Sequence, residues 1–197
     1  MIDYIRGELA ELTPTEATIE AAGVGYLLCI SLNSYTALQG KKEAKLYVYE
    51  SIREDAYQLF GFASRQERKL FEELLSVSGI GGQTARTILS AFSPSELLQT
   101  IGSEDVRALK AVKGIGPKAA QRIIVELKDR VLALMGDVQA TAGQKVAVSS
   151  PVASEATGAL ATLGFPPAAV HKVVTAILKD NPDLEVEQVI KQALKML

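Results

Sequence analysis

The sequence predicts a chain of several domains with mixed α and β class: a small β-barrel, a helical domain, a flexible linker and a small three-helix domain. Three observations support this division. Alternating and β-branched runs fill the first sixty residues, helical periodicity begins after Gly61, and a stretch of small residues without strong periodicity follows Met135. The expected boundaries are residues 1–63 for the barrel, 64–135 for the helical domain, 136–153 for the linker and 154–197 for the C-terminal domain.

Five strands are expected in the first domain, separated by turn-forming residues. They are Met1–Arg6, Ala17–Ala22, Tyr26–Leu32, Lys45–Tyr49 and Ala56–Phe60. A short helix fits residues 33–40, with Asn33 as N-cap and Gly40 just after its end. Five short strands with one helix between the third and fourth are the layout of a Greek-key barrel of the OB type.

Helix starts are predicted where capping residues precede an apolar period. Ser64 with Glu67 and Ser93 with Glu96 form capping boxes, and Ser103 opens a further helix. One long helix is expected over Pro117–Met135. The C-terminal domain is expected to contain helices over Ser154–Leu163, closed by Gly164, over Pro167–Lys179, and over Leu184–Met196.

The helical domain contains an internal duplication. Residues 74–89 read LLSVSGIGGQTARTIL and residues 109–124 read LKAVKGIGPKAAQRII, with seven identities in sixteen positions. In each copy a helix ends, a Gly-Ile-Gly turn follows and a second helix starts. Glycines permit positive φ and close approach of a ligand, the Ile is expected to point inward, and the free N–H groups of the next helix attract anions. Two such turns suit the phosphates of a nucleic acid, whereas two ordinary helix connections are the alternative.

Charge is unevenly distributed along the chain. The net charge of −2 comprises five basic and nine acidic residues in 1–63, eleven and eight in 64–135, and five and six in 136–197. The basic excess therefore coincides with the repeated turns, which favours binding of a polyanion, although a solvated helical surface would produce the same excess.

Several functional classes are not supported by the sequence. Cys29 is the one cysteine and His171 the one histidine, so an internal disulfide, a Cys-based zinc cluster and a two-histidine metal site are excluded. No GxxxxGK[ST] loop is present, so any ATP hydrolysis must come from a partner. The charged N-terminus and the lack of an 18-residue apolar run predict a soluble, cytosolic protein. We expect no catalytic residue, no cofactor and no metal.

The order of barrel, paired hairpins, linker and three-helix tail resembles the RuvA family, the Holliday-junction-binding subunits of bacterial branch-migration complexes. Supporting stretches are Gly23–Tyr26, Arg53–Ala56, Phe60–Phe62, Gln66–Arg68 and Arg122–Arg130. The resemblance implies a homotetramer that holds a four-way DNA junction open and recruits RuvB, a hexameric ATPase, through the tail. It names the RuvC resolvase as a further partner, and leaves open whether one tetramer or two stacked tetramers, an octamer, bind the DNA.

The resemblance also implies roles for particular residues. Glu54 and Asp55 take the place of an acidic pair at the junction centre, although an exposed hairpin turn is the alternative. Val170, Val174, Leu163 and Phe165 are the expected partner-binding residues of the tail. The phosphate contacts fall on Ser78, Gly79, Gly81, Gly82, Gln83, Thr84, Lys113, Gly114, Gly116, Pro117, Lys118, Ala119 and Arg122.

The first hairpin departs from the family pattern, which has a Pro and a Lys where this chain has Gly82 and Gln83. We therefore expect the first hairpin to add less salt-dependent affinity than the second, or to take charge from Arg86. Two rival functions remain. A hairpin-containing glycosylase would need a catalytic Asp, for which Asp129 is the nearby residue, and a general single-strand-binding protein would use aromatic residues on the barrel.

Overall fold

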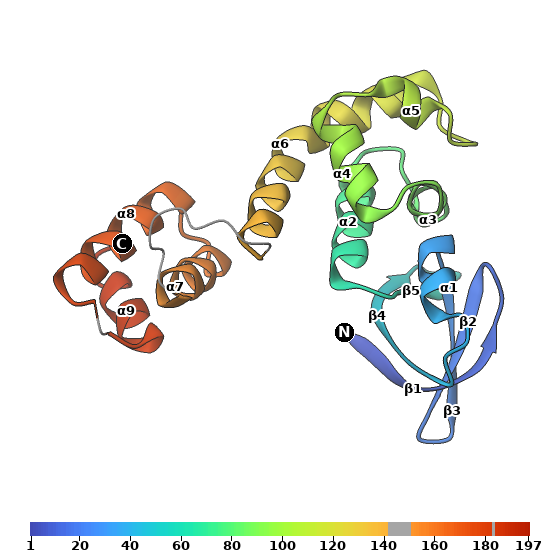
Figure 1. Cartoon of the computed structure of the whole chain (residues 1–197), viewed down its shortest axis with the longest axis horizontal. Coiled ribbons are helices and arrows are strands. Elements are labelled where there is room, and N and C mark those ends of the chain that lie inside the picture. Colours follow the sequence, from blue (N-terminus) through green and yellow to red (C-terminus); the bar gives the residue numbers. More distant parts are fainter. Residues whose placement is uncertain (142–150, 183) are drawn as a thin grey trace. The chain divides into compact units, whose positions relative to one another are not determined.

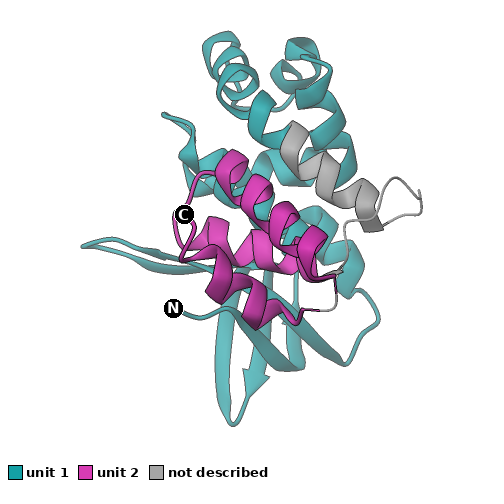
Figure 2. Cartoon of the chain, turned by 90° about the vertical axis from the view of Figure 1, so that its left-hand side faces the viewer, with its two compact units in different colours: residues 1–142 teal, residues 143–197 magenta. Residues whose placement is uncertain are grey.

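The computed structural model of the chain (Figure 1) describes residues 1–141, 151–182 and 184–197. It contains two compact units, Met1–Ala142 and Gly143–Leu197, which Figure 2 shows in separate colours. The first unit holds the barrel and both hairpins, and the second holds the C-terminal helices.

Five strands form a closed barrel in the order β1-β2-β3-β5-β4, which confirms the predicted OB-type architecture. Neighbouring strands are antiparallel except β3 and β5, which are parallel. Strand β1 is longer than predicted because its second half pairs with β2 around a bulge between Leu9 and Glu11. The strands are β1 (Tyr4–Leu12), β2 (Glu16–Ala21), β3 (Val24–Ile30), β4 (Glu43–Ile52) and β5 (Tyr57–Phe62).

Helix α1 (Leu32–Leu38) lies between β3 and β4 as predicted, but its N-cap is Ser31 and not Asn33. The Ser31 hydroxyl accepts the N–H of Ser34 at 3.1 Å. Asn33 instead reaches out of the barrel, where its side-chain amide donates to two carbonyls of the helical half. At the other end, Gly40 follows the C-cap with a φ of +74°, as expected.

The hairpins share a hydrophobic core with strand β5. The rings of Phe60 and Phe62 each lie 4.8 Å from the ring of Phe71 in α2. The buried residues of β5 and of the helical half form one continuous cluster, so the barrel holds the hairpins in a fixed arrangement. The helices of this half are α2 (Arg65–Ser76), α3 (Gly82–Ala91), α4 (Pro94–Gly102), α5 (Val106–Lys110) and α6 (Pro117–Thr141).

The helix caps agree only in part with the predictions. Ser93 and Glu96 form the predicted capping box of α4. Helix α5 is capped by Asp105, whose carboxylate accepts two N–H groups, whereas Ser103 caps the C-terminus of α4. The predicted start at Ser103 is therefore wrong. Ser64 caps α2, but the side chain of Glu67 turns toward α1 instead of completing a box.

Helix α6 continues beyond the predicted end at Met135, into the segment expected to be a linker. A glycine inside a helix costs about 1 kcal/mol relative to Ala, so Gly136 need not end it, and residues 137–141 contain no proline. Residues 142–150 of the expected linker lie outside the described residues.

The second unit contains three helices, as predicted, with partly different bounds: α7 (Pro151–Thr162), α8 (Pro167–Asp180) and α9 (Val186–Ala193). Helix α7 begins three residues before the predicted start at Ser154, inside the expected linker, and α9 is shorter than the predicted Leu184–Met196. Gly164, with a φ of +93°, follows α7. Leu160, Val170, Val174 and Val189 meet in a small core of their own.

Candidate nucleic-acid interface

The two copies of the repeat fold into the same turn. The N–H of Ile80 donates to the carbonyl of Val77 at 3.0 Å, and that of Ile115 donates to Val112 at 3.1 Å. Both isoleucines are buried, as predicted. The duplication in sequence is therefore also a duplication in structure.

The two glycines of each turn have different roles, which the sequence did not separate. Gly79 and Gly114 have φ values of +89° and +90°, a region that favours glycine. Gly81 has an ordinary φ of −96° and is the N-cap of α3. A Cβ atom on Gly81 or Gly116 would meet no atom within 4 Å. The second glycine of each turn thus leaves open space in front of a helix N-terminus.

Unpaired backbone N–H groups face that open space. The first N–H groups of an α-helix have no acceptor within the helix, and they carry the positive end of its dipole. Gly81 and Gly116 have no side chain that would accept these hydrogen bonds, so each turn is suited to an anion. The donors are the N–H groups of Gly82, Gln83 and Thr84 on α3, and of Lys118 and Ala119 on α6.

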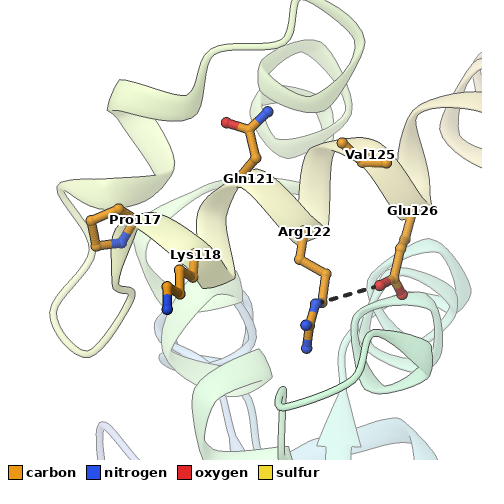
Figure 3. Close-up of a pocket in the computed structure, with 6 residues that line it drawn as sticks. All are labelled: Pro117, Lys118, Gln121, Arg122, Val125 and Glu126. Atoms are coloured by element: carbon orange, nitrogen blue, oxygen red, sulfur yellow. Dashed lines mark ion pairs between the residues drawn. The ribbon is translucent and has the colours of Figure 1, made fainter.

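The second hairpin adds positive side chains to its backbone donors. Lys113 and Lys118 are exposed, and neither has an ion pair within the described residues. Figure 3 shows Lys118 and Arg122 on one side of α6, along an open groove that Val125 also lines. The Arg122 charge is partly compensated, because its Nε lies 3.7 Å from Oε1 of Glu126.

Arg122 also connects the two turns. Its Nη1 donates to the carbonyl of Ser78, in the first turn, at 2.9 Å. The side chain is about half exposed, so the remaining guanidinium N–H groups stay accessible to a ligand.

The first hairpin lacks a comparable cation. Gln83 is exposed and offers only an amide at the position of Lys118. Arg86, three residues after Gln83, donates from Nη1 to the carbonyl of Thr15 in the barrel at 2.9 Å, which directs part of its guanidinium toward the barrel. The first turn therefore offers its backbone N–H groups and Gln83, with the remaining guanidinium N–H groups of Arg86 as its nearest positive charge in sequence.

Packing explains why glycine stands at position 82. A Cβ atom there would lie 2.6 Å from Cζ of Phe60. Phe60 is buried against Phe71 and has no room to move aside. Gly82 thus lets the first hairpin approach the barrel closely, a contact that Pro at this position would prevent.

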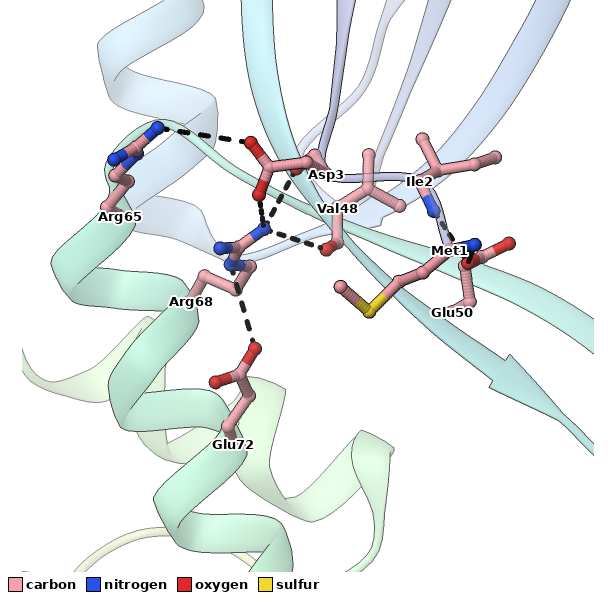
Figure 4. A network of polar contacts seen from close by, with 8 residues as sticks. All are labelled: Met1, Ile2, Asp3, Val48, Glu50, Arg65, Arg68 and Glu72. Carbon is pink, nitrogen blue, oxygen red and sulfur yellow. Dashed lines mark hydrogen bonds and ion pairs between the residues drawn. The ribbon is translucent and has the colours of Figure 1, made fainter. Parts of the chain in front are cut away.

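A polar network at the start of α2 anchors the helix that leads into the first turn (Figure 4). Nη1 of Arg68 donates to Oδ1 of Asp3 at 2.7 Å and to the Val48 carbonyl at 3.4 Å. The hydrogen bond from Arg68 holds the pKa of the Asp3 carboxyl below its ordinary value. Helix α2 is thereby attached to the segment just before β1 and to β4.

The acidic pair lies at the tip of the β4–β5 hairpin. The N–H of Arg53 donates to the Ala56 carbonyl at 2.8 Å and closes the turn. Glu54 and Asp55 are both exposed, and neither has a hydrogen bond or an ion pair in the part of the chain that the structure describes. Their charges are thus directed into solvent, which fits an acidic pin and an ordinary exposed turn equally.

The residues expected to bind a partner in the tail divide into two groups. Leu163 is 61% exposed and Phe165 is half-buried, so both are available at the surface. Val170 and Val174 are fully buried in the three-helix core, which removes them from any contact surface in this conformation. Met196 and Leu197, which follow α9, are further exposed apolar residues of this unit that were not among the predicted contacts.

Other candidate residues lie apart from the turns. Cys29 is buried, and burial raises the pKa of its thiol. Asp129 and His171 are exposed on α6 and α8. Among the described residues, no group of three His, Cys, Asp or Glu side chains is arranged to hold a metal ion. No helix in the described ranges has the length and apolarity needed to cross a membrane.

Comparison with known proteins covers the whole chain. Residues 1–61 match the RuvA N terminal domain, residues 71–129 the SAM-like helix-hairpin-helix tandem, and residues 151–197 the RuvA C-terminal domain. Proteins named Holliday junction branch migration complex subunit RuvA are similar over their full length and that of this chain. That of Bacteroides thetaiotaomicron is 57% identical, that of Parabacteroides distasonis 54% and that of Porphyromonas gingivalis 48%.

Proposed function

The chain belongs to the RuvA family, and on this premise we propose that it binds four-way (Holliday) junction DNA by structure and not by sequence. In this proposal it recruits the hexameric ATPase RuvB and so supports branch migration in homologous recombination and DNA repair. It is the non-catalytic subunit: RuvB hydrolyses ATP, and both act in the cytoplasm, where the bacterial chromosome lies.

One observation carries the proposal, namely two equivalent turns on one rigid unit that present open backbone N–H groups. Backbone donors bind phosphates without regard to base, so this arrangement suits structure-specific recognition. Lys113, Lys118 and Arg122 add charge at the second turn. The first turn contributes Ser78, Gln83 and Thr84, with less salt-dependent affinity.

Assembly completes the site. A homotetramer would place four copies of the paired turns around one junction, and a second tetramer on the opposite face would give an octamer. Glu54 and Asp55 would then gather at the junction centre, where carboxylates repel phosphates. RuvB would bind the surface of the second unit around Leu163 and Phe165, and RuvC would act on the same junction.

A competition gel shift at near-physiological salt and without ATP tests the proposal. A labelled four-way junction is competed with unlabelled junction, duplex or single-stranded DNA of equal length. We expect only the unlabelled junction to compete strongly. Stronger competition by single strands would favour a general strand-binding protein, and cleavage of damaged duplex would favour a glycosylase.

A further inference from the structure

A buried carboxylate lies where the barrel meets the first hairpin. Glu67, in the first turn of α2, is 2% exposed. Its Oε2 accepts the hydroxyl of Ser34 at 2.7 Å, and its Oε1 accepts the hydroxyl of Ser31. Among the described residues no cation forms an ion pair with it.

Both carboxyl oxygens of Glu67 must act as hydrogen-bond acceptors in this arrangement. The N–H of Ser34 donates to the Ser31 hydroxyl at 3.1 Å, and the N–H of Ala63 donates to the Ser34 hydroxyl at 2.8 Å. Each hydroxyl therefore accepts from the backbone and uses its own hydrogen on the carboxylate. An amide or a protonated acid would turn a donor toward one hydroxyl and leave a buried hydrogen without an acceptor.

An ionised carboxylate at this buried position lowers the stability of the folded state. Burial raises the pKa of Glu67, and the hydroxyls of Ser31 and Ser34 and the nearby Ala63 N–H only partly oppose that shift. A carboxyl whose pKa is raised by folding contributes less to stability as the pH rises through that pKa. Because the buried Glu67 carboxylate does not stabilise the fold, we attribute its presence to the single hydrogen-bonding arrangement that it specifies.

Helix α1, which Glu67 holds in place, also forms hydrogen bonds with the C-terminal end of α3. The amide of Asn33 donates to the carbonyls of Leu89 and Phe92 at 2.6 and 2.7 Å. The N–H of Leu32 donates to the Ser90 hydroxyl at 3.1 Å. Helix α1 thus holds the C-terminal end of α3, while the N-terminal end of α3 forms the first turn.

We infer that Glu67 is a positioning residue for DNA binding: by fixing the hydroxyls of Ser31, the N-cap of α1, and of Ser34 within α1, it makes this helix a strut that sets the orientation of α3 and of the first phosphate-binding turn. The inference rests on the proposed function for its effect on DNA, but its effect on α3 is independent of DNA.

The experiment compares the full-length wild type with Glu67→Gln, Asn33→Ala and a matched control, Glu96→Gln. Glu96 is also the third residue of a helix that a serine caps, but it is exposed. Hydrogen exchange is measured without DNA, and junction affinity is measured over a range of salt concentrations.

In Glu67→Gln we expect faster exchange in α1 and in residues 79–84, with unchanged exchange in residues 114–119. The junction Kd should rise about three- to thirtyfold, as for other coupled positions without ligand contact. The salt slope should not change, because no phosphate contact is removed. The unfolding temperature should stay within about 4 °C of wild type, because removal of the buried charge offsets the lost hydrogen bond. Asn33→Ala should also speed exchange in α1 and in residues 79–84 but not in residues 114–119. Glu96→Gln should resemble wild type.

Unchanged exchange in residues 79–84 of both variants would overturn the inference, as would faster exchange spread equally over both turns. If Glu67→Gln does not fold, Asn33→Ala alone decides, because it breaks the strut without changing the buried carboxylate. If wild type itself shows no junction preference, the proposed function fails, while the exchange measurement still tests the strut.

Discussion

The guanidinium of Arg122 donates a hydrogen bond of 2.9 Å to the carbonyl of Ser78. Arg122 belongs to the second copy of the repeat and Ser78 to the first, so this side chain helps to fix the spacing of the two turns, together with the hydrophobic core that the hairpins share. If both turns contact phosphates of the same strand, their spacing must be fixed, and this hydrogen bond contributes to fixing it.

Replacing Arg122 should separate its two roles. Arg122→Lys keeps the positive charge but loses the fork that can face a carbonyl and a phosphate together. We expect Arg122→Lys to retain the salt dependence of junction binding with weaker affinity. Arg122→Gln should also lower the salt slope by about 1. Titrations at four salt concentrations distinguish them, and wild-type affinity for Arg122→Lys would contradict the spacing role.

Filling the space at the second turn should abolish binding without unfolding the protein. A Cβ atom on Gly116 would meet no atom within 4 Å, so Gly116→Leu should be compatible with the fold, and its side chain would occupy the space in front of the α6 N-terminus. Gly158→Leu in α7 is the matched control, since that glycine is equally open. Gel shifts and thermal melts are the measurements. The same change at Gly114 should add backbone strain of about 1–2 kcal/mol. A folded Gly116→Leu protein with normal junction binding would refute the phosphate assignment.

Adding a lysine to the first turn should strengthen binding. Gln83→Lys places a cation at the position that Lys118 holds in the second copy, and we expect the salt slope to rise by about 1. Gln99→Lys adds the same charge at an exposed position of α4, a helix that forms neither turn, and should change affinity much less. Equal effects of the two changes would mean that general charge, and not the turn, decides affinity.

Neutralising the acidic pair should affect migration more than binding. With Glu54→Gln and Asp55→Asn, repulsion of phosphates is lost, so junction affinity should stay the same or rise. The rate or selectivity of branch migration with RuvB should change. Glu8→Gln with Glu20→Gln removes the same charge from exposed barrel positions and serves as the control. If the migration assay gives identical results for both double variants and wild type, Glu54 and Asp55 are an ordinary turn.

Removing residues 154–197 should preserve junction binding and abolish recruitment of RuvB. In the full chain, Leu163→Asp should weaken recruitment because it places a charge on an exposed apolar side chain, 61% of which is accessible. His171→Asp on the exposed part of α8 is the control. A pull-down with RuvB measures recruitment, and retained RuvB binding after the deletion would disprove the role of the tail.

Much of the fold was predictable because local patterns decide it. Runs of alternating and β-branched residues predicted the strands of the barrel, and the internal repeat predicted the two hairpins. Caps were less predictable where several capping residues adjoin, as at Ser103 and Asp105, since side chains of either kind can accept the same N–H groups. Asn33 is a suitable cap by type, but a contact with α3, more than fifty residues later, determines its role.

The site was predictable in position but not in detail. The glycine spacing located both turns, yet it could not tell which glycine takes a positive φ. Phe60 excludes a proline at position 82, because its ring lies close to Gly82 in space although it is distant in sequence. Val170 and Val174 show the same limit in the tail: in a small helical domain, an apolar pattern does not distinguish the core from a contact surface.

The parallel pairing of β3 with β5 has a consequence for how the chain folds. Leu28 pairs with Leu59 and Cys29 with Phe60, so this contact closes a loop that contains α1 and β4. Contacts across such loops form late, because chain entropy must be lost before the pairing is gained. The closing strand also carries the ring of Phe60 against which Gly82 packs. We therefore expect the first turn to reach its final packing only after the barrel has closed, so that slow closure would delay DNA binding even if every helix had already formed.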